Sequence, residues 1–377
     1  MTPEKLLEAF TDLEDMDIMN AKKQKTRHAA PGRRFAVLIA AVIAMMAITV
    51  TAFAAEEISG WFAKFFENNT EAPLSTGQLD FIEENEQIIG ETQIRDGYTL
   101  ELKSAITDGK IAYILLGITA PEDMPLNRTE IPGYSKKPPV MHFGNDVSDL
   151  LQTEDGEPIT LATFTYTIQE DTDGLDNTQD ILITAIPAVP GEAETALNSG
   201  SVWKLHIDDL IAEYCNDSFR KEMEKKYNGF AHEKLTDEEL AKVYPKEVLT
   251  EEEWTFAVSF DSSDFRETEL IESPLTLSIC VGMRPEDGRD VYMDMKITSF
   301  GLRSLSASIY CEDKSFAPEI GNNFDRPIYV VMEDGQRIRL KADTGLPGEQ
   351  KLVAETPILL DEVSHVLLPG GIELPMP

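Results

Sequence analysis

The chain has few of the residues that build disulfide, redox and metal sites. Its 377 residues include three cysteines and five histidines. The odd number of cysteines means that at least one thiol is free or joins another chain. No cysteine precedes position 215, which excludes a cysteine-ligated zinc site in the N-terminal segment. Cys280 and Cys311 lie in strand-like runs, where they either pair with each other or stay buried as free thiols.

Motifs of catalytic chemistry are equally scarce. Asp343-Thr344-Gly345 matches the aspartic-protease triplet, but that chemistry needs two facing carboxylates, and the local pattern indicates a turn. Ser201 and Lys204 match S-x-x-K in a strand-like segment that lacks the accompanying Lys-Thr-Gly. The chain has no phosphate-binding loop and no nucleotide fingerprint. The sequence therefore predicts no catalytic residue and no cofactor, and an enzyme is the least favoured class.

Positive charge is also scarce. The chain has 33 Lys and Arg residues against 68 Asp and Glu residues, a formal net charge of −35. This excludes nucleic acid as a partner, because binding to phosphates requires Lys and Arg. It also argues against adhesion of the acidic part to anionic lipid. The simplest role of such a surface is solubility.

One segment carries no charge at all. Residues 35–55 read FAVLIAAVIAMMAITVTAFAA, and nine of these residues are Leu, Ile, Val or Phe. An α-helix of this length is about 31 Å long, close to the hydrocarbon thickness of a bilayer. The insertion free energies of the nine side chains sum to roughly −3 to −5 kcal/mol. The sequence therefore predicts one transmembrane helix in contact with membrane lipid through residues 35–55.

The flanking charges predict the orientation of this helix. Residues 21–34 carry six Lys and Arg residues and no acid, whereas Glu56 and Glu57 follow the apolar run. Positive flanks stay in the cytoplasm, so we expect a cytoplasmic N-terminus and an extracellular segment from residue 56 to 377. Residues 1–34 hold seven basic and six acidic residues, a net charge of +1, which leaves −36 for the remainder.

A cleaved secretory leader is the competing interpretation of the same run. Ala52-Phe53-Ala54 followed by Ala55 is an acceptable cleavage pattern. However, the 34 residues before the run contain six acids, and they exceed the basic region of an ordinary leader. A retained single-pass anchor in the cell membrane is therefore the favoured interpretation.

An aromatic stripe follows the predicted span. Ile58, Trp61, Phe62 and Phe65 recur at the spacing of one helix face. At this position the rings suit the interfacial belt among lipid headgroups. Equally, the stripe suits packing beneath the outer domain, and the sequence leaves both interpretations open.

The predicted cytoplasmic segment contains an amphipathic helix. Thr2 and Pro3 suit its start, and Leu6, Phe10 and Leu13 then recur on one face. Thirty-four residues are too few to bury a core, so this face is exposed unless a partner covers it. The functional interpretation is a segment that folds on a cytoplasmic partner through these three residues. The alternative is a disordered leader whose basic half only fixes the topology.

The outer part is predicted to be mainly β. After a helix at 76–89, two strands at 98–107 and 110–119 flank Asp108-Gly109, a strong hairpin signal. Short strands separated by Gly, Pro and Asp turns indicate β-sandwiches rather than a parallel sheet. The remaining strands are expected at 161–169, 181–188, 202–207, 254–260, 275–281, 292–297, 305–311, 328–332, 337–341 and within 358–368.

A charged stretch interrupts these strands and predicts the domain limits. We expect helices at 208–227 and 237–243, and hence a helical connector over residues 209–250. The connector separates a first extracytoplasmic β-rich domain, 56–208, from a C-terminal β domain, 251–377.

One loop is rich in oxygen ligands. Asp171, Asp173, Asp176 and Asp180 lie within ten residues, but the spacing differs from an EF-hand. A loop calcium site is a weak candidate, and a solvated loop between strands is the default interpretation.

The order of these segments resembles a known family. The residues concerned are Leu6-Leu-Glu-Ala-Phe, Asp12-Leu-Glu-Asp-Met, a Lys/Arg cluster, one anchor, Ile58-Ser-Gly-Trp-Phe, and the hairpin from Leu100 to Pro121. Over roughly residues 1–125 the chain resembles the bacterial family called "domain of unknown function 4179". The part from about 255 onward is similar to the immunoglobulin-like domains often appended to that family.

The resemblance implies a Gram-positive single-pass membrane protein and a candidate anti-sigma factor, whose partner is an extracytoplasmic-function sigma factor. It carries over no catalytic residue, and the chain lacks the cysteine and histidine motif of zinc-type anti-sigma domains. The leading hypothesis is therefore a signalling protein that senses an unknown extracellular ligand or envelope condition. The alternative is a cell-surface binding or structural protein without a transcriptional role.

Overall fold

The computed structural model describes residues 60–68, 70, 73–122, 124, 126, 132–135, 139–144, 147–168, 177–187, 197, 200–227, 229, 234–260, 266–283, 290–314 and 327–377. The predicted cytoplasmic segment 1–34 and the predicted span 35–55 lie outside these residues. Within the described part, no helix has the length and apolar character needed to cross a bilayer.

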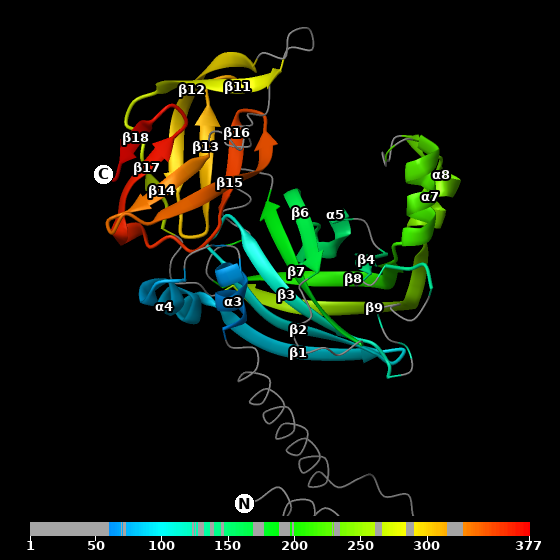
Figure 1. The fold of residues 1–377 in the computed structure, drawn as a ribbon. Coiled ribbons are helices and arrows are strands. Elements are labelled where there is room, and N and C mark those ends of the chain that lie inside the picture. The colour runs from blue at the N-terminus through cyan, green and yellow to red at the C-terminus, as the bar shows by residue number, and fades with distance from the viewer. Residues whose placement is uncertain are drawn as a thin grey trace, which may run out of the picture. The chain divides into compact units, whose positions relative to one another are not determined.

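The described chain is mainly β, as predicted, and its strands form three antiparallel sheets (Figure 1). Sheet A has the order β1-β2-β3-β7-β6. Its strands are β1 (Gln87–Arg95), β2 (Tyr98–Thr107), β3 (Ala112–Thr119), β6 (Leu161–Ile168) and β7 (Thr178–Pro187).

The predicted β2–β3 hairpin forms around Asp108 and Gly109, and Gly109 adopts the left-handed backbone (φ 87°) that favours glycine. Strand β3 is apolar throughout because both of its faces are covered. Ile114 and Leu116 belong to one core, whereas Tyr113 and Leu115 belong to another on the opposite face.

Sheet B lies against the first of these faces. It comprises β4 (Val140–Phe143), β5 (Leu151–Thr153), β8 (Ser201–Glu213) and β9 (Lys246–Phe260), with the short helix α5 (Val147–Leu150) before β5. Trp203, Trp254 and Phe256 project from β8 and β9 into the core shared with sheet A. Large aromatic side chains fill the space between two sheets with few residues.

The long β8–β9 hairpin corrects the expected helix at 208–227. Strand β8 continues to Glu213 and pairs with β9 along its whole length. Ser201 lies opposite Phe260 at one end, and Glu213 lies opposite Lys246 at the other. Helix α7 (Asp217–Tyr227) begins only after the strand. The sequence Asp208-Asp209 resembles the start of a helix. In the structure Asp209 has a φ of 47° and forms a bulge within the strand.

The stretch 209–250 therefore belongs to a hairpin of sheet B instead of separating two β domains. Helices α7 and α8 (Asp237–Val243) lie between β8 and β9 (Figure 1). Helix α8 has the predicted bounds, and a capping box between Thr236 and Glu239 fixes its start. The core of sheets A and B extends to Phe260, ten residues beyond the expected connector.

Sheet C contains the C-terminal part of the described chain in nine antiparallel strands. The hairpin β14–β15 forms at the predicted Asp334-Gly335 turn. The buried faces of the strands enclose one core that includes Phe300, Ile309 and Val330. The strands are β10 (Thr268–Glu269), β11 (Leu275–Met283), β12 (Asp290–Leu302), β13 (Ser306–Cys311), β14 (Ile328–Met332), β15 (Arg337–Leu346), β16 (Glu349–Ala354), β17 (Val363–Leu368) and β18 (Ile372–Pro375), with a 3-10 turn η2 (Leu360–Glu362) before β17.

Candidate functional site

Helix α3 (Trp61–Asn68) covers the second face of sheet A. Phe62 and Phe66 are 0% and 1% exposed, and both rings lie against Tyr113 of β3, with centroid distances of 6.4 and 6.0 Å. The side chain of Trp61 stacks on that of Phe65, and both pack against the same core. Of the two interpretations of the aromatic stripe, packing beneath the β sheets is therefore the one observed for its described residues.

Helix α4 (Thr76–Asn85) connects this core with sheet C. The Gln78 side chain is buried and donates hydrogen bonds to the Pro357 carbonyl oxygen (2.6 Å) and the Thr356 hydroxyl (3.2 Å). A Cβ atom on Gly77 would lie 2.6 Å from Leu359 Cδ1, so a larger residue there would displace the end of the Leu359 side chain. The helix ends at Asn85, four residues earlier than expected, because the chain turns into β1 at Gln87.

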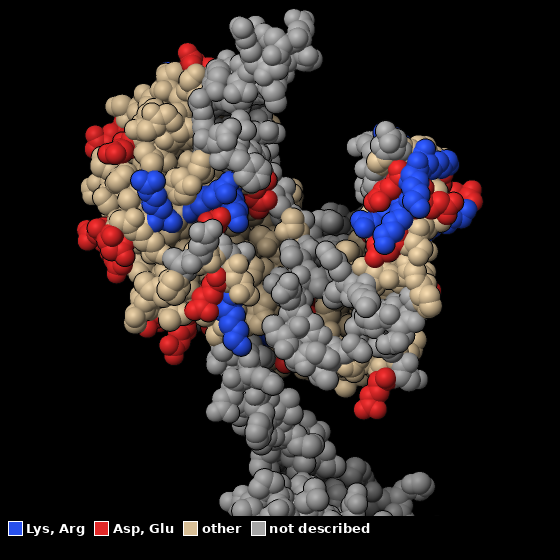
Figure 2. All heavy atoms as spheres, viewed as in Figure 1, with Lys and Arg blue, Asp and Glu red and all other residues tan. Residues whose placement is uncertain are grey.

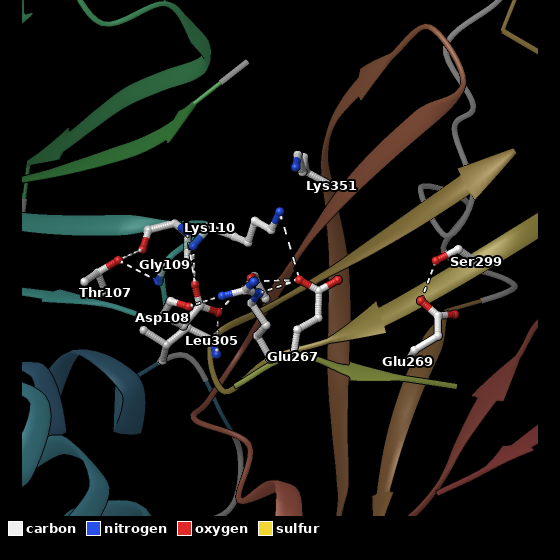
Figure 3. A network of polar contacts seen from close by, with 12 residues as sticks. Thr107, Asp108, Gly109, Lys110, Glu267, Glu269, Ser299, Leu305 and Lys351 are labelled. Atoms are coloured by element: carbon white, nitrogen blue, oxygen red, sulfur yellow. Dashed lines mark hydrogen bonds and ion pairs between the residues drawn. The ribbon is translucent and has the colours of Figure 1, made fainter. Parts of the chain in front are cut away.

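A buried carboxylate joins the β2–β3 turn to sheet C (Figure 3). Asp108 is 0% exposed. Its Oδ1 accepts hydrogen bonds from the backbone N–H groups of Lys110 (2.9 Å) and Ile111 (3.1 Å). Its Oδ2 accepts from the Leu305 N–H (3.0 Å) and the Ser306 hydroxyl (2.7 Å). One side chain thus closes its own turn and holds a strand almost two hundred positions away; we call this cluster the Asp108 joint.

Arg303 completes the Asp108 joint. Its Nη1 donates to the Asp108 carbonyl oxygen (2.9 Å), and its Nε and Nη2 donate to Glu267 Oε2 (2.9 and 2.6 Å). The Lys110 ammonium lies 4.0 Å from the same Glu267 oxygen. Nearby, the buried pair Lys351–Glu349 has an N–O distance of 2.5 Å. Arg303, Lys110 and Lys351 are buried, and each has a carboxylate within ion-pair distance. Removal of one partner from a buried pair leaves an uncompensated charge, which is strongly destabilising.

A second acid, half-buried, lies at the junction of α4 and β1. Burial raises the pKa of Glu86 from 4.5 to about 7, although hydrogen bonds with the Ser104 side chain and the Gly60 backbone act in the opposite direction. Gly60 directly precedes α3. Burial therefore favours the protonated form of Glu86, which lies beside the first described residues of the chain.

The calcium candidate divides between described and undescribed residues. Asp180 lies in β7, and its Oδ1 is 2.8 Å from Lys103 Nζ, so this carboxylate is in an ion pair. Asp171, Asp173 and Asp176 lie outside the described residues, as do the predicted partner-binding residues Leu6, Phe10 and Leu13.

The residues that match catalytic motifs lie within strands. Asp343 is in β15 at an irregularity of its pairing with β16, and not in the expected turn. Ser201 and Lys204 lie in β8, as the pattern predicted, and Lys204 Nζ donates to the Glu154 carbonyl oxygen (2.5 Å).

Cys311 is a buried free thiol 3.0 Å from the Met295 sulfur, and burial raises its pKa to about 11. Ile297 of β12 pairs with Leu275 of β11 on one side and with Cys311 of β13 on the other. Strand β12 thus lies between β13 and β11, the strand that holds Cys280. Two strand spacings of about 4.8 Å add to roughly 10 Å, whereas a disulfide spans at most roughly 7 Å between Cα atoms. The structure thus favours the free-thiol interpretation.

A group of metal-ligand type lies on the β8–β9 hairpin. One ligand atom from each of His206, Asp208 and Glu253 lies within 4.8 Å of the other two. The sequence pattern missed this group because its residues come from two strands 45 positions apart, and only the pairing register brings them together. No linear spacing could have indicated it.

Helices α7 and α8 carry charges of both signs. Figure 2 shows Lys and Arg interleaved with Asp and Glu over these helices. Lys226 bonds Glu239 across the two helices, and Lys242 lies 2.7 Å from Glu238 within α8. Only Met223 and Val243 are buried among their residues. This insertion therefore presents a polar surface.

Comparisons with known proteins give a distant structural likeness only. No protein-family model and no curated protein matches the chain. The solved structure described as the conserved domain protein from Bacillus anthracis has a TM-score of 0.38 and 11% identity, over 76% of this chain and 80% of that one. A structure of S. aureus TarS has a TM-score of 0.17 and 9% identity, over 79% of this chain and 46% of that one.

Proposed function

We propose that this chain is a single-pass membrane signalling protein of the anti-sigma-factor type. Residues 35–55 cross the membrane, the N-terminal segment lies in the cytoplasm, and the β sheets lie outside as two extracytoplasmic, sandwich-like domains, the second immunoglobulin-like. Leu6, Phe10 and Leu13 bind a cytoplasmic partner, an extracytoplasmic-function sigma factor. This assignment follows the resemblance to the "domain of unknown function 4179" family.

One observation carries the proposal. Twenty-one uncharged residues separate a segment whose last fourteen residues include six basic ones from an outer part with a net charge of −36. The insertion energetics and the positive-inside bias both favour a membrane span with this orientation.

The contacts of α3 and α4 support a sensory role for the outer part. The chain enters α3 at Trp61, six residues after the predicted span, and Phe62 and Phe66 are buried under sheet A. Gln78 and the Asp108 joint tie the same region to sheet C. A ligand that changes the relation of sheet C to sheet A would therefore act on the residues next to the span.

Two measurements on the full-length chain test this proposal. Single cysteines introduced in a cysteine-free background at Asn20 and Glu373 report topology through an impermeant thiol reagent, and we expect labelling from outside only at position 373. Phe10→Ala should abolish co-purification of a sigma factor and change transcription of its target promoter, whereas Asp12→Ala, on the polar face of the same helix, should change neither. Capture and transcription that are unaffected by Phe10→Ala would reject the signalling role.

A cell-surface binding protein is the second candidate. The α7–α8 insertion favours it, because its charges of both signs could steer and orient a partner of complementary charge. Deletion of residues 2–20 without any transcriptional effect, together with the expected labelling pattern, would select this function over signalling.

A further inference from the structure

Four polar residues form a block on one face of the β8–β9 hairpin. His206 and Asp208 are two positions apart in β8, so their side chains share a face. The pairing places Thr255 opposite His206 and Glu253 opposite Asp208. The intervening residues Ile207 and Trp254 point the other way, into the core of sheets A and B, and are fully buried.

The side-chain geometry is that of a ligand set. His206 Nε2 lies 2.9 Å from Asp208 Oδ1, and a Glu253 carboxylate oxygen completes a triangle with no side above 4.8 Å. The other ring nitrogen, Nδ1, lies 3.0 Å from the Thr255 hydroxyl. A hydrogen bond at one imidazole nitrogen fixes the ring and directs the second nitrogen toward a metal.

The backbone under this block is fixed. A register slip would expose Ile207 and Trp254, so the pairing of the four residues is strongly specified. The Gly144 N–H donates to the Asp208 carbonyl oxygen (2.5 Å), and the Gln93 amide donates to the Thr255 carbonyl oxygen (2.6 Å). A site on strands anchored from both sides is preorganised for a ligand.

The negative charge of the block favours a bound cation. Asp208 and Glu253 are directly opposite each other, a like-charge arrangement that destabilises a strand pair. The neighbouring residues Asp209, Glu251 and Glu252 add further negative charge. The nearest cation on this face of β8, Lys204, is bonded to the Glu154 carbonyl oxygen.

We propose that His206, Asp208 and Glu253 bind one divalent transition-metal ion, with Zn²⁺ as the preferred ion. Three protein ligands of the N and O type suit zinc, whereas the imidazole ligand disfavours Ca²⁺ and Mg²⁺. Neutral His206 donates from Nδ1 to Thr255 and coordinates through Nε2. The inference is independent of the signalling role proposed above.

Calorimetric titration of the full-length chain in detergent with ZnCl₂ tests the site. We expect one equivalent of Zn²⁺ to bind, with binding lost in His206→Ala and weakened by about 10–100-fold in Thr255→Val, which removes only the orienting hydroxyl. His365→Ala, which alters a half-buried histidine in β17, is the matched control and should bind as the unaltered chain does. Melting curves without metal establish that each variant is folded.

Cobalt gives a second readout of the same ligands. Co²⁺ should produce visible absorption bands in the unaltered chain that zinc displaces and that Glu253→Gln alters. The proposal is overturned if no stoichiometric binding occurs, if His206→Ala binds zinc as well as the unaltered chain, or if an equal concentration of Ca²⁺ displaces the zinc. In the first two cases the His206–Asp208 contact is a simple ion pair.

Discussion

The two Asp-Gly hairpin turns of this chain are locally alike, but they have different roles. In both turns the aspartate Oδ1 accepts a hydrogen bond from the N–H two residues ahead, Asp108 from Lys110 and Asp334 from Gln336. Asp334 is exposed and makes only this local contact among the hydrogen bonds described for it. Asp108 is fully buried and also holds Leu305 and Ser306 of the sheet C region. The same dipeptide is a local turn signal in one place and a long-range joint in the other.

Replacing the joint aspartate should have the largest effect. Asp108→Ala leaves the Leu305 N–H and the Ser306 hydroxyl without their buried acceptor, whereas Arg303 keeps its bond to the backbone carbonyl oxygen of residue 108. Each buried donor left unsatisfied costs about 1–3 kcal/mol, so we expect a loss of about 2–6 kcal/mol in the free energy of unfolding. Urea denaturation of the full-length chain, followed by tryptophan fluorescence, measures it.

Asp334→Ala is the matched control in the second turn. It removes one exposed hydrogen bond, and the expected loss is about 0.5–1 kcal/mol. Equal losses in the two variants would show that Asp108 contributes only its turn, and the idea of a joint would then be wrong.

This comparison also shows how far the sequence predicts the fold. Both turns, strand β14 and helix α8 were predicted correctly because Asp-Gly and the capping box act within a few residues. Strand β1 was missed because its first residues were assigned to the end of the expected helix at 76–89, and β8 was cut short because acids interrupt the apolar pattern at Asp208–Asp209. Pairing with a neighbouring strand overrides the local preference at these places.

The candidate sites were less predictable than the fold. The sequence marks Asp108 as a turn residue, but its bond to Leu305 joins residues 197 positions apart. His206 and Glu253 likewise meet only through the register of β8 and β9. By contrast, the acidic run with a conspicuous linear pattern includes Asp180, which lies in β7 and pairs with Lys103. Local composition identifies ligand types, whereas long-range pairing determines which of them converge.

Glu86 should make the stability of the protein depend on pH. Burial is the main cause of its pKa shift, and no basic side chain contributes to that shift. The pKa of Glu86 rises from 4.5 in the unfolded chain to about 7 in the folded one. The folded state therefore binds the proton more tightly, so this contribution is fully favourable below pH 4.5 and is lost as the pH rises to about 7. The total change is up to about 3 kcal/mol.

The variant Glu86→Gln mimics the protonated acid and should remove this contribution. We expect the difference in unfolding free energy between the variant and the unaltered chain to grow in favour of the variant from pH 4.5 to 7.5. Glu83→Gln, at an exposed position of the same helix, is the control and should show a constant difference. A constant difference for Glu86→Gln as well would contradict the raised pKa.

Removal of the ion pair on the α7–α8 insertion should have the smallest effect on the free energy of unfolding. It tests an exposed charge pair against the buried contacts of Asp108. Lys226 bonds Glu239 between the two helices, and the lysine side chain is exposed, so screening and side-chain entropy offset much of the attraction. Lys226→Met leaves the capping box of Thr236 and Glu239 intact, and it removes the ion pair together with the contact of the ammonium with the Tyr227 ring. We expect an unchanged urea midpoint at both low and high salt. A loss in unfolding free energy as large as that of Asp334→Ala would mean that the insertion contributes to the stability of the β8–β9 hairpin. It would also mean that this exposed ion pair matters more for stability than its exposure to solvent predicts.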